Sequence, residues 1–248
     1  MYTIRKILSH NKNLYKLVSK FYHFSFEFLM SLSCKLNNVV YLKPIKARGK
    51  YKSQFGQDYY LCKLGLLKKN GFFIEIGAND PKYNSNTYFL EKQFMYRGIS
   101  VDALDYSKKF KLLRPRTKFY KKIIDEFKGI KKLYKVIDED GWENQMSSIY
   151  KENLETGKTF KAEIINVKSI PLKDLIPKRK VDILLIDVEG HELNVLRSAN
   201  LKKFRPDVIL IENSGELYSR DKLTKFLKDN FYRLHYRIGL SDDIYLKM

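Results

Sequence analysis

Short apolar runs alternate with amphipathic stretches from about residue 50 to the end of the chain, and this alternation limits the possible folds. The amphipathic stretches have helical spacing, whereas the apolar runs are mostly continuous, as in strands buried on both faces of a parallel sheet. Strands of this kind joined by helices form βαβ units. The predicted strands are Phe72–Ile76, Gly98–Val101, Lys118–Ile123, Val181–Ile186 and Val208–Ile211, and the predicted helices are Asn86–Phe94, His191–Ser198 and Tyr218–Lys228. We therefore predict an α/β, Rossmann-like fold with a mostly parallel sheet.

The end of the chain predicts an antiparallel pair in addition to the parallel strands. Phe231–Ile238 and Asp242–Lys247 have strand character, and Gly239 between them is typical of a turn. Lys131–Ile137 and Ala162–Ile170 are two further candidate strands.

The first 48 residues differ from the rest, because lysines and aromatic residues dominate there. We predict a basic helical N-terminal extension at residues 1–48 and a single domain at residues 49–248, with a linker at Lys43–Gly49. The most apolar window, Phe21–Leu42, contains charged and amide side chains, so we expect no membrane-spanning helix and no signal peptide. Two interpretations stay open: helices that pack on the domain or on a partner, or a segment at Lys16–Phe28 that lies on a membrane surface.

The formal net charge of +20 raises the question of a nucleic-acid partner. The cations are 37 lysines and 11 arginines spread along the chain, whereas specific readout prefers clustered arginine forks. We therefore expect no specific nucleic-acid partner. Cys34 and Cys62 form neither a disulfide framework nor a metal-binding pair, which favours a reducing, cytoplasmic location, with peripheral membrane contact left open. The oligomeric state is left open too.

The end of the first predicted strand indicates a ligand site. Glu75 is followed by Gly77 and Ala78, which allow a tight turn and close backbone approach to a ligand. Neither the full dinucleotide fingerprint nor a phosphate-binding loop is present. Asp102 ends the second strand, where doubly wound folds bind ribose hydroxyls. Together these residues point to S-adenosylmethionine, with Gly77 and Ala78 beside its amino-acid part and Asp102 on its ribose.

A series of motifs resembles the FkbM-type methyltransferase family. In chain order the motifs are Ser53–Asp58, Phe73–Asp80, Ser85–Thr87, Tyr96–Asp102 and Ile186–Glu192. The resemblance covers about residues 51–215 and implies a seven-stranded class I methyltransferase fold, S-adenosylmethionine as cofactor, cofactor contacts at Glu75 and Asn79, and O-methylation of natural products or glycans. Two positions depart from the family pattern: Pro81 replaces a usual glycine, and Asp102 replaces the more common glutamate.

Acidic residues cluster after the fourth and fifth predicted strands. Asp187, Glu189 and His191 follow the fourth strand, and Glu212 with Asn213 ends the next. Because parallel strands end at one sheet edge, these groups should face one cleft. Asp187, Glu189 and His191 are the candidate catalytic residues, with His191 as general base. Alternatively, Asp187, Glu212 and Asn213 hold Mg²⁺. For Glu192 and His191, helix-start capping is the competing interpretation.

Several further residues are weaker candidates for cofactor contact. Asn86 and Thr87 either cap a helix or bind the cofactor carboxylate. Asp125, after the third strand, is a candidate acceptor for the adenine amine, and the polar loop at Gln145–Ser148, including Ser147, is a candidate contact for cofactor or acceptor hydroxyls. Gln57 and Asp58 either fold over the cofactor or cap a helix.

The sequence therefore predicts an S-adenosylmethionine-dependent O-methyltransferase whose acceptor is a hydroxyl of a sugar, a glycan precursor or a similar small molecule. The sugar follows from the family resemblance. One alternative is a nucleic-acid methyltransferase, although the Asn/Asp-Pro-Pro-aromatic motif of the amino-methylating class is absent after the fourth strand. The other alternative is a non-catalytic cofactor-binding or scaffold module.

Overall fold

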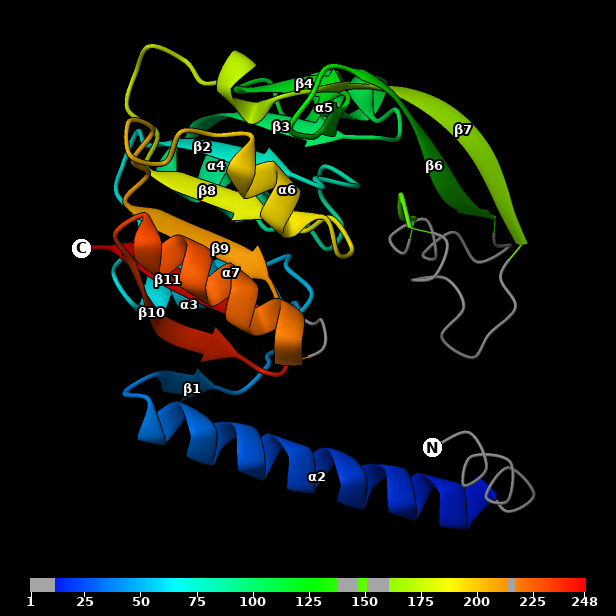
Figure 1. The fold of residues 1–248 in the computed structure, drawn as a ribbon, viewed down its shortest axis with the longest axis vertical. Helices are drawn as coiled ribbons and strands as arrows, with labels where there is room; N and C mark the ends of the chain where they lie inside the picture. Colours follow the sequence, from blue (N-terminus) through cyan, green and yellow to red (C-terminus); the bar gives the residue numbers. More distant parts are fainter. Residues whose placement is uncertain (1–11, 138–146, 151–160, 214–216) are drawn as a thin grey trace.

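The computed structural model describes residues 12–137, 147–150, 161–213 and 217–248, and its centre is one eight-stranded sheet (Figure 1). The strand order across this sheet is β1-β10-β11-β9-β8-β2-β3-β4. The strands are β1 (Val40–Leu42), β2 (Phe72–Ile76), β3 (Arg97–Asp102), β4 (Thr117–Lys121), β8 (Ile183–Ile186), β9 (Val208–Glu212), β10 (Tyr232–Ile238) and β11 (Asp242–Lys247). All pairings are parallel except those that β11 makes with β10 and β9. The predicted mostly parallel α/β fold is confirmed.

The expected number of seven strands is wrong, because the segment before residue 49 contributes an eighth. Strand β1 pairs in parallel with β10, with Val40 opposite Tyr236. The backbone N–H of Gly239 also donates to the carbonyl of Leu42, at 2.9 Å. A three-residue strand at a sheet edge carries too little pattern to be recognised in a sequence.

A second, three-stranded sheet stands beside the first and contains β5 (Ile123–Ile124), β7 (Lys161–Ile170) and β6 (Gly129–Ile137). The predicted single strand Lys118–Ile123 is therefore split between the two sheets. The main sheet ends at Lys121, and Ile123 pairs with Ser169 in the second sheet. Continuous apolar character does not reveal such a change of partner.

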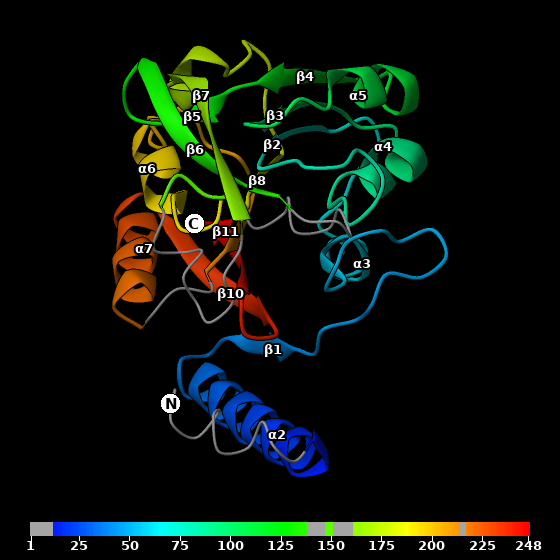
Figure 2. The ribbon, with the colours of Figure 1, turned by 90° about the vertical axis from the view of Figure 1, so that its right-hand side faces the viewer.

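Helices cover both faces of the main sheet (Figures 1 and 2). The helices α3 (Gln57–Lys63), α4 (Tyr88–Phe94) and α5 (Ser107–Leu113) lie on one face, and α6 (Glu192–Arg197) and α7 (Leu217–Asp229) lie on the other. Alternate residues of each strand point to opposite faces, so Phe73 packs with α3 and α4, whereas Ile74 packs with α6 and α7. These two buried cores keep the carboxyl ends of β2, β3, β8 and β9 at one edge.

The 25-residue helix α2 (Lys12–Leu36) lies outside these layers, next to β1 (Figures 1 and 2). Among the described residues, no helix is long and apolar enough to cross a membrane.

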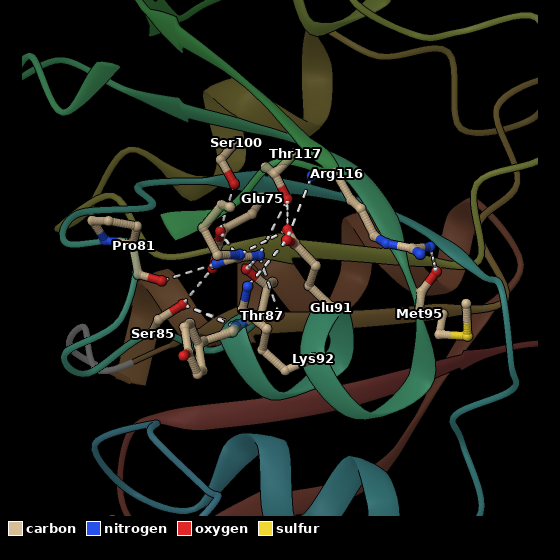
Figure 3. Close-up of polar contacts among 12 residues, drawn as sticks. Glu75, Pro81, Ser85, Thr87, Glu91, Lys92, Met95, Ser100, Arg116 and Thr117 are labelled. Atoms are coloured by element: carbon tan, nitrogen blue, oxygen red, sulfur yellow. Dashed lines mark hydrogen bonds and ion pairs between the residues drawn. The ribbon is translucent and has the colours of Figure 1, made fainter. Parts of the chain in front are cut away.

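A buried arginine holds the loop that follows β2. Arg114, at the end of α5, is fully buried and donates to Glu91 Oε2 at 2.8 Å, to Thr87 Oγ1 at 3.0 Å and to the carbonyl of Pro81 at 3.1 Å. Thr117 Oγ1 on β4 donates to the same carboxylate oxygen of Glu91 (Figure 3). The loop after β2, helix α4 and strand β4 are thereby tied to one cation.

We expect Arg114→Met to lower the free energy of unfolding by about 3–5 kcal/mol, because it leaves the Glu91 carboxylate buried without its cation. The matched control is Arg116→Met. The Arg116 side chain is exposed, and its guanidinium donates to the carbonyl of Met95 at 3.4 Å. We expect a loss below about 1 kcal/mol there. Urea unfolding measures both, and equal losses for the two variants would contradict the account.

Candidate functional site

A cavity of about 400 Å³ opens at the carboxyl edge of the main sheet. Its size lies within the range of small-molecule and cofactor sites. The loops after β2, β3 and β8 form most of its wall, as expected at the edge where parallel strands end. The predicted site residues on this wall are Gly77, Ala78, Asn79, Asn86, Asp102, Ser147, Asp187, Glu189, His191 and Glu212.

The loop after β2 lies directly against the tip of β8. Gly77 has φ +80°, and a Cβ atom at this position would lie 1.6 Å from the carbonyl oxygen of Asp187. Only glycine fits such an approach. The backbone N–H groups of Gly77 and Ala78 donate to the carbonyl of Val101, at 2.9 and 3.1 Å. The loop is therefore fixed between β8 and β3.

Asp102 lies on the cavity wall at the end of β3. Its Oδ2 accepts the backbone N–H of Asn79 and its Oδ1 accepts that of Leu104, both at 2.8 Å. Burial is the main cause that raises the pKa of Asp102 to about 6. Each carboxylate oxygen has a second lone pair, so the side chain can still accept two hydroxyl protons from a ligand.

Asn86 lines the same cavity and also contains a buried, unsatisfied acceptor. Its Oδ1 is buried and has no hydrogen-bond partner among the residues that the structure describes. Buried polar atoms without a partner are uncommon in folded proteins.

Glu75 and Thr87 do not line the cavity, although the sequence points to them as cofactor contacts. Glu75 Oε2 accepts hydrogen bonds from Thr87 Oγ1 and Ser100 Oγ, both at 2.8 Å (Figure 3). Burial raises the pKa of Glu75, and the nearby Arg114 guanidinium opposes that shift. The structure thus gives both residues a supporting position beneath the loop.

Three carboxylates converge at the other end of the cavity. One oxygen each of Asp187, Glu189 and Glu212 lies within 4.8 Å of the others. Burial, followed by the charge of Glu212, raises the pKa of Asp187 well above its ordinary value. The same two causes raise the pKa of Glu189 to about 8. A cation, a proton or a hydroxyl donor would relieve this repulsion, and we call these three residues the acid cluster.

The acid cluster differs from the predicted metal set, because Asn213 is absent from it. The Asn213 amide donates to Asp243 Oδ2 at 2.7 Å, and Asp243 is also held by two hydrogen bonds from Arg237 at 2.6 Å. Glu189 takes the third place instead. Its φ of +53° turns the chain directly after Val188.

His191 lies on the cavity wall with both ring nitrogens near other groups. Its Nδ1 lies 3.0 Å from the Tyr150 hydroxyl, and its Nε2 lies 3.3 Å from Asp125 Oδ1. The Lys131 ammonium forms an ion pair with the same carboxylate. Burial is the main cause that lowers the pKa of His191, which keeps the ring neutral at pH 7.

Asp125 and Tyr150 therefore differ from the sequence-based expectation. The sequence makes Asp125 a candidate for the adenine amine, but Asp125 is absent from the cavity wall and contacts His191 and Lys131. Tyr150 was not recognised, because it lies beside the second sheet and nothing in its neighbouring sequence marks it. The contact between them and His191 arises only when the two sheets come together.

The remaining candidates have structural partners. Glu192 Oε1 accepts the backbone N–H of Gly190 at 3.0 Å, which fits the helix-start interpretation. Gln57 Oε1 accepts the N–H of Phe55 at 2.9 Å, and Phe55 lines the cavity. Ser147 Oγ accepts the N–H of Val136 at 3.2 Å. Gln145 lies outside the described residues.

Eleven chains of solved structures match this chain, and they include the following two. A putative RNA methyltransferase from Pyrococcus horikoshii is 10% identical over 84% of this chain and 91% of its own, with a TM-score of 0.45. A putative ribosomal RNA methyltransferase from Plasmodium falciparum is 15% identical over 77% of this chain and 94% of its own, with a TM-score of 0.37. No curated protein matches the chain.

The family comparison covers most of the domain. The model of the methyltransferase FkbM domain matches residues 75–238, which is more than half of the chain. The match begins within β2 and includes every residue of the acid cluster. It therefore confirms the resemblance seen in the sequence motifs. The chain belongs to the FkbM methyltransferase family.

Proposed function

We propose that this methyltransferase transfers the methyl group of S-adenosylmethionine to a hydroxyl of a sugar, a glycan precursor or a similar small molecule. The supporting observation is the shared wall of one cavity. A glycine loop with a strand-end carboxylate lies on that wall next to the acid cluster. A nucleoside site and a site for an acceptor hydroxyl are thereby adjacent. The choice of a sugar as the acceptor rests on the resemblance to the family.

The residues present fit the cofactor. Gly77 leaves room for close backbone contact, and Asp102 has free lone pairs for both ribose hydroxyls. Asn86 lies on the same wall and is a candidate contact for the cofactor carboxylate. The bound cofactor supplies a methyl group activated on sulfonium. Asp102 stands where the family usually has glutamate. The shorter side chain reaches less far toward the ribose but offers the same carboxylate oxygens as acceptors.

We assign the activation of the acceptor hydroxyl to the acid cluster. An alcohol needs a base that removes its proton as the methyl group is transferred. Asp187 lies at the tip of β8 against Gly77, so it borders the proposed cofactor position. We assign Asp187 as this base, and Glu189 and Glu212 as the neighbours that favour its protonated form. The sequence makes His191 the candidate base, but both of its ring nitrogens lie near Tyr150 and Asp125, so we assign it to hold the cavity wall.

Nucleic-acid methylation is the second candidate, because the net charge of +20 favours association with polyanions. The acid cluster opposes that function, because it brings no cation to the point where a phosphate group would have to bind. A methyl-transfer assay on separate glycan and RNA fractions distinguishes the two candidates. The same assay tests the non-catalytic alternative, which gives no transfer to either fraction.

Cofactor binding should depend on the protonation of Asp102. Ribose hydroxyls donate to the charged carboxylate, so a protonated Asp102 binds them less well. Because its pKa is about 6, the affinity for S-adenosylhomocysteine should fall as the pH drops below 6, by at most about tenfold per pH unit. Calorimetry between pH 5 and 8 measures this. Asp102→Asn should bind more weakly and lose that part of the pH dependence, and unchanged affinity in this variant would remove Asp102 from the ribose.

Asp187→Asn should lower methyl transfer to the glycan fraction by at least about 100-fold, since general-base groups contribute about 10²–10⁴-fold. Cofactor affinity should remain within about threefold of wild type, because the amide keeps the shape of the carboxylate. Labelled S-adenosylmethionine provides the readout. Asp229→Asn, at an exposed position on α7, is the matched control. Retained transfer in Asp187→Asn would refute the assignment of the base, and label in the RNA fraction alone would refute the acceptor class.

The acid cluster also offers hard oxygen ligands, so Mg²⁺ remains the alternative for acceptor activation. Asp187, Glu189 and Glu212 would hold the ion, and its charge would favour the deprotonated acceptor hydroxyl. We expect full activity after treatment with EDTA, because Asp187 acts as the base. Loss of activity that Mg²⁺ restores would contradict this expectation and assign the three carboxylates to a metal.

A further inference from the structure

Helix α2 exposes an apolar stripe along its C-terminal half. The exposed side chains Phe24, Phe28, Leu32 and Leu36 follow one another at intervals of four residues, and Leu29 lies beside them. Residues three and four apart are neighbours on a helix, so these side chains form one continuous surface. Contiguous apolar surfaces of this kind usually mark an interaction site.

The domain does not cover this stripe. The opposite side of the helix faces β1 and β10, where Cys34 is buried and Met30 Sδ lies 3.4 Å from Arg237 Nη1. A groove of about 700 Å³, which Leu29 at the edge of the stripe also lines, lies between the helix and the domain. The helix therefore lies beside the sheet edge instead of packing into a core (Figure 2).

The sequence extends the same amphipathic pattern to the start of α2. The sequence of its first half, residues 12–21, combines leucine, valine and phenylalanine with three lysines. A helix of 25 residues that exposes phenylalanine and leucine side chains and contains four lysines is typical of a helix that lies in a membrane interface.

Charge decides between the possible occupants of the stripe. A second copy of this chain would bring together two bodies of net charge +20, which repel each other. An anionic lipid surface attracts the same charge and accepts the apolar side chains at the boundary between head groups and acyl chains. We propose that α2 is a membrane-surface helix that holds this methyltransferase against an anionic bilayer.

Vesicle binding by the full chain tests the proposal. We expect sedimentation with vesicles of phosphatidylcholine and phosphatidylglycerol, and much weaker sedimentation with phosphatidylcholine alone. Raising the salt from about 0.1 M to about 1 M should weaken binding, because the Debye length falls from about 10 Å to about 3 Å. The variant Phe28→Ser/Leu32→Ser should bind at least about tenfold more weakly, since it removes two side chains from the buried surface.

The matched control is Leu112→Ser/Phe127→Ser, which removes the same two residue types from other surfaces. Phe28 and Leu32 are 63% and 45% exposed, and Leu112 and Phe127 are 81% and 75% exposed, so neither pair should change the melting temperature. The control should bind vesicles like the wild type. Equal losses in both variants, or no binding to anionic vesicles at low salt, would overturn the proposal. Self-association that only Phe28→Ser/Leu32→Ser abolishes, without vesicle binding, would assign the stripe to a second copy instead.

Discussion

The close approach of two backbones at Gly77 and Asp187 organises the whole site. An ideal Cβ at residue 77 would overlap the carbonyl oxygen of Asp187, so the glycine loop and the tip of β8 stay in contact only because the side chain is absent. The proposed cofactor loop and the acid cluster thus become one continuous wall. Arg114 holds the far end of this loop through the carbonyl of Pro81, so the loop is fixed at both ends.

The positions of most site residues could be predicted because they depend on topology alone. Residues that end parallel strands meet at one edge, so Asp102, Asp187 and Glu212 were expected together and are found on one cavity wall. The strands that carry them are short, continuous apolar runs bounded by turn residues, a pattern that a sequence shows clearly. The Gly77 turn was expected for the same reason.

The predictions that differ from the structure depend on side-chain partners far away in the sequence. Asn213 donates a hydrogen bond to Asp243 on β11. Asp125 contacts His191 and Lys131, because the second sheet brings these residues together. Local sequence cannot reveal such partners. Strand β1 could not be predicted for another reason. A strand of three residues at a sheet edge is too short to show a hydrophobic pattern. The Glu189 position depends on a backbone turn with positive φ at a non-glycine residue, which sequence rarely reveals.

The central claim is that one cavity holds a nucleoside at Asp102 and places its sulfur beside Asp187. A crystal structure with S-adenosylhomocysteine bound tests it most directly. The account predicts both ribose hydroxyls within hydrogen-bond distance of the Asp102 carboxylate and the sulfur on the side of the cavity that Asp187 lines. A nucleoside bound elsewhere, or one in this cavity with its ribose turned away from Asp102, would contradict the account.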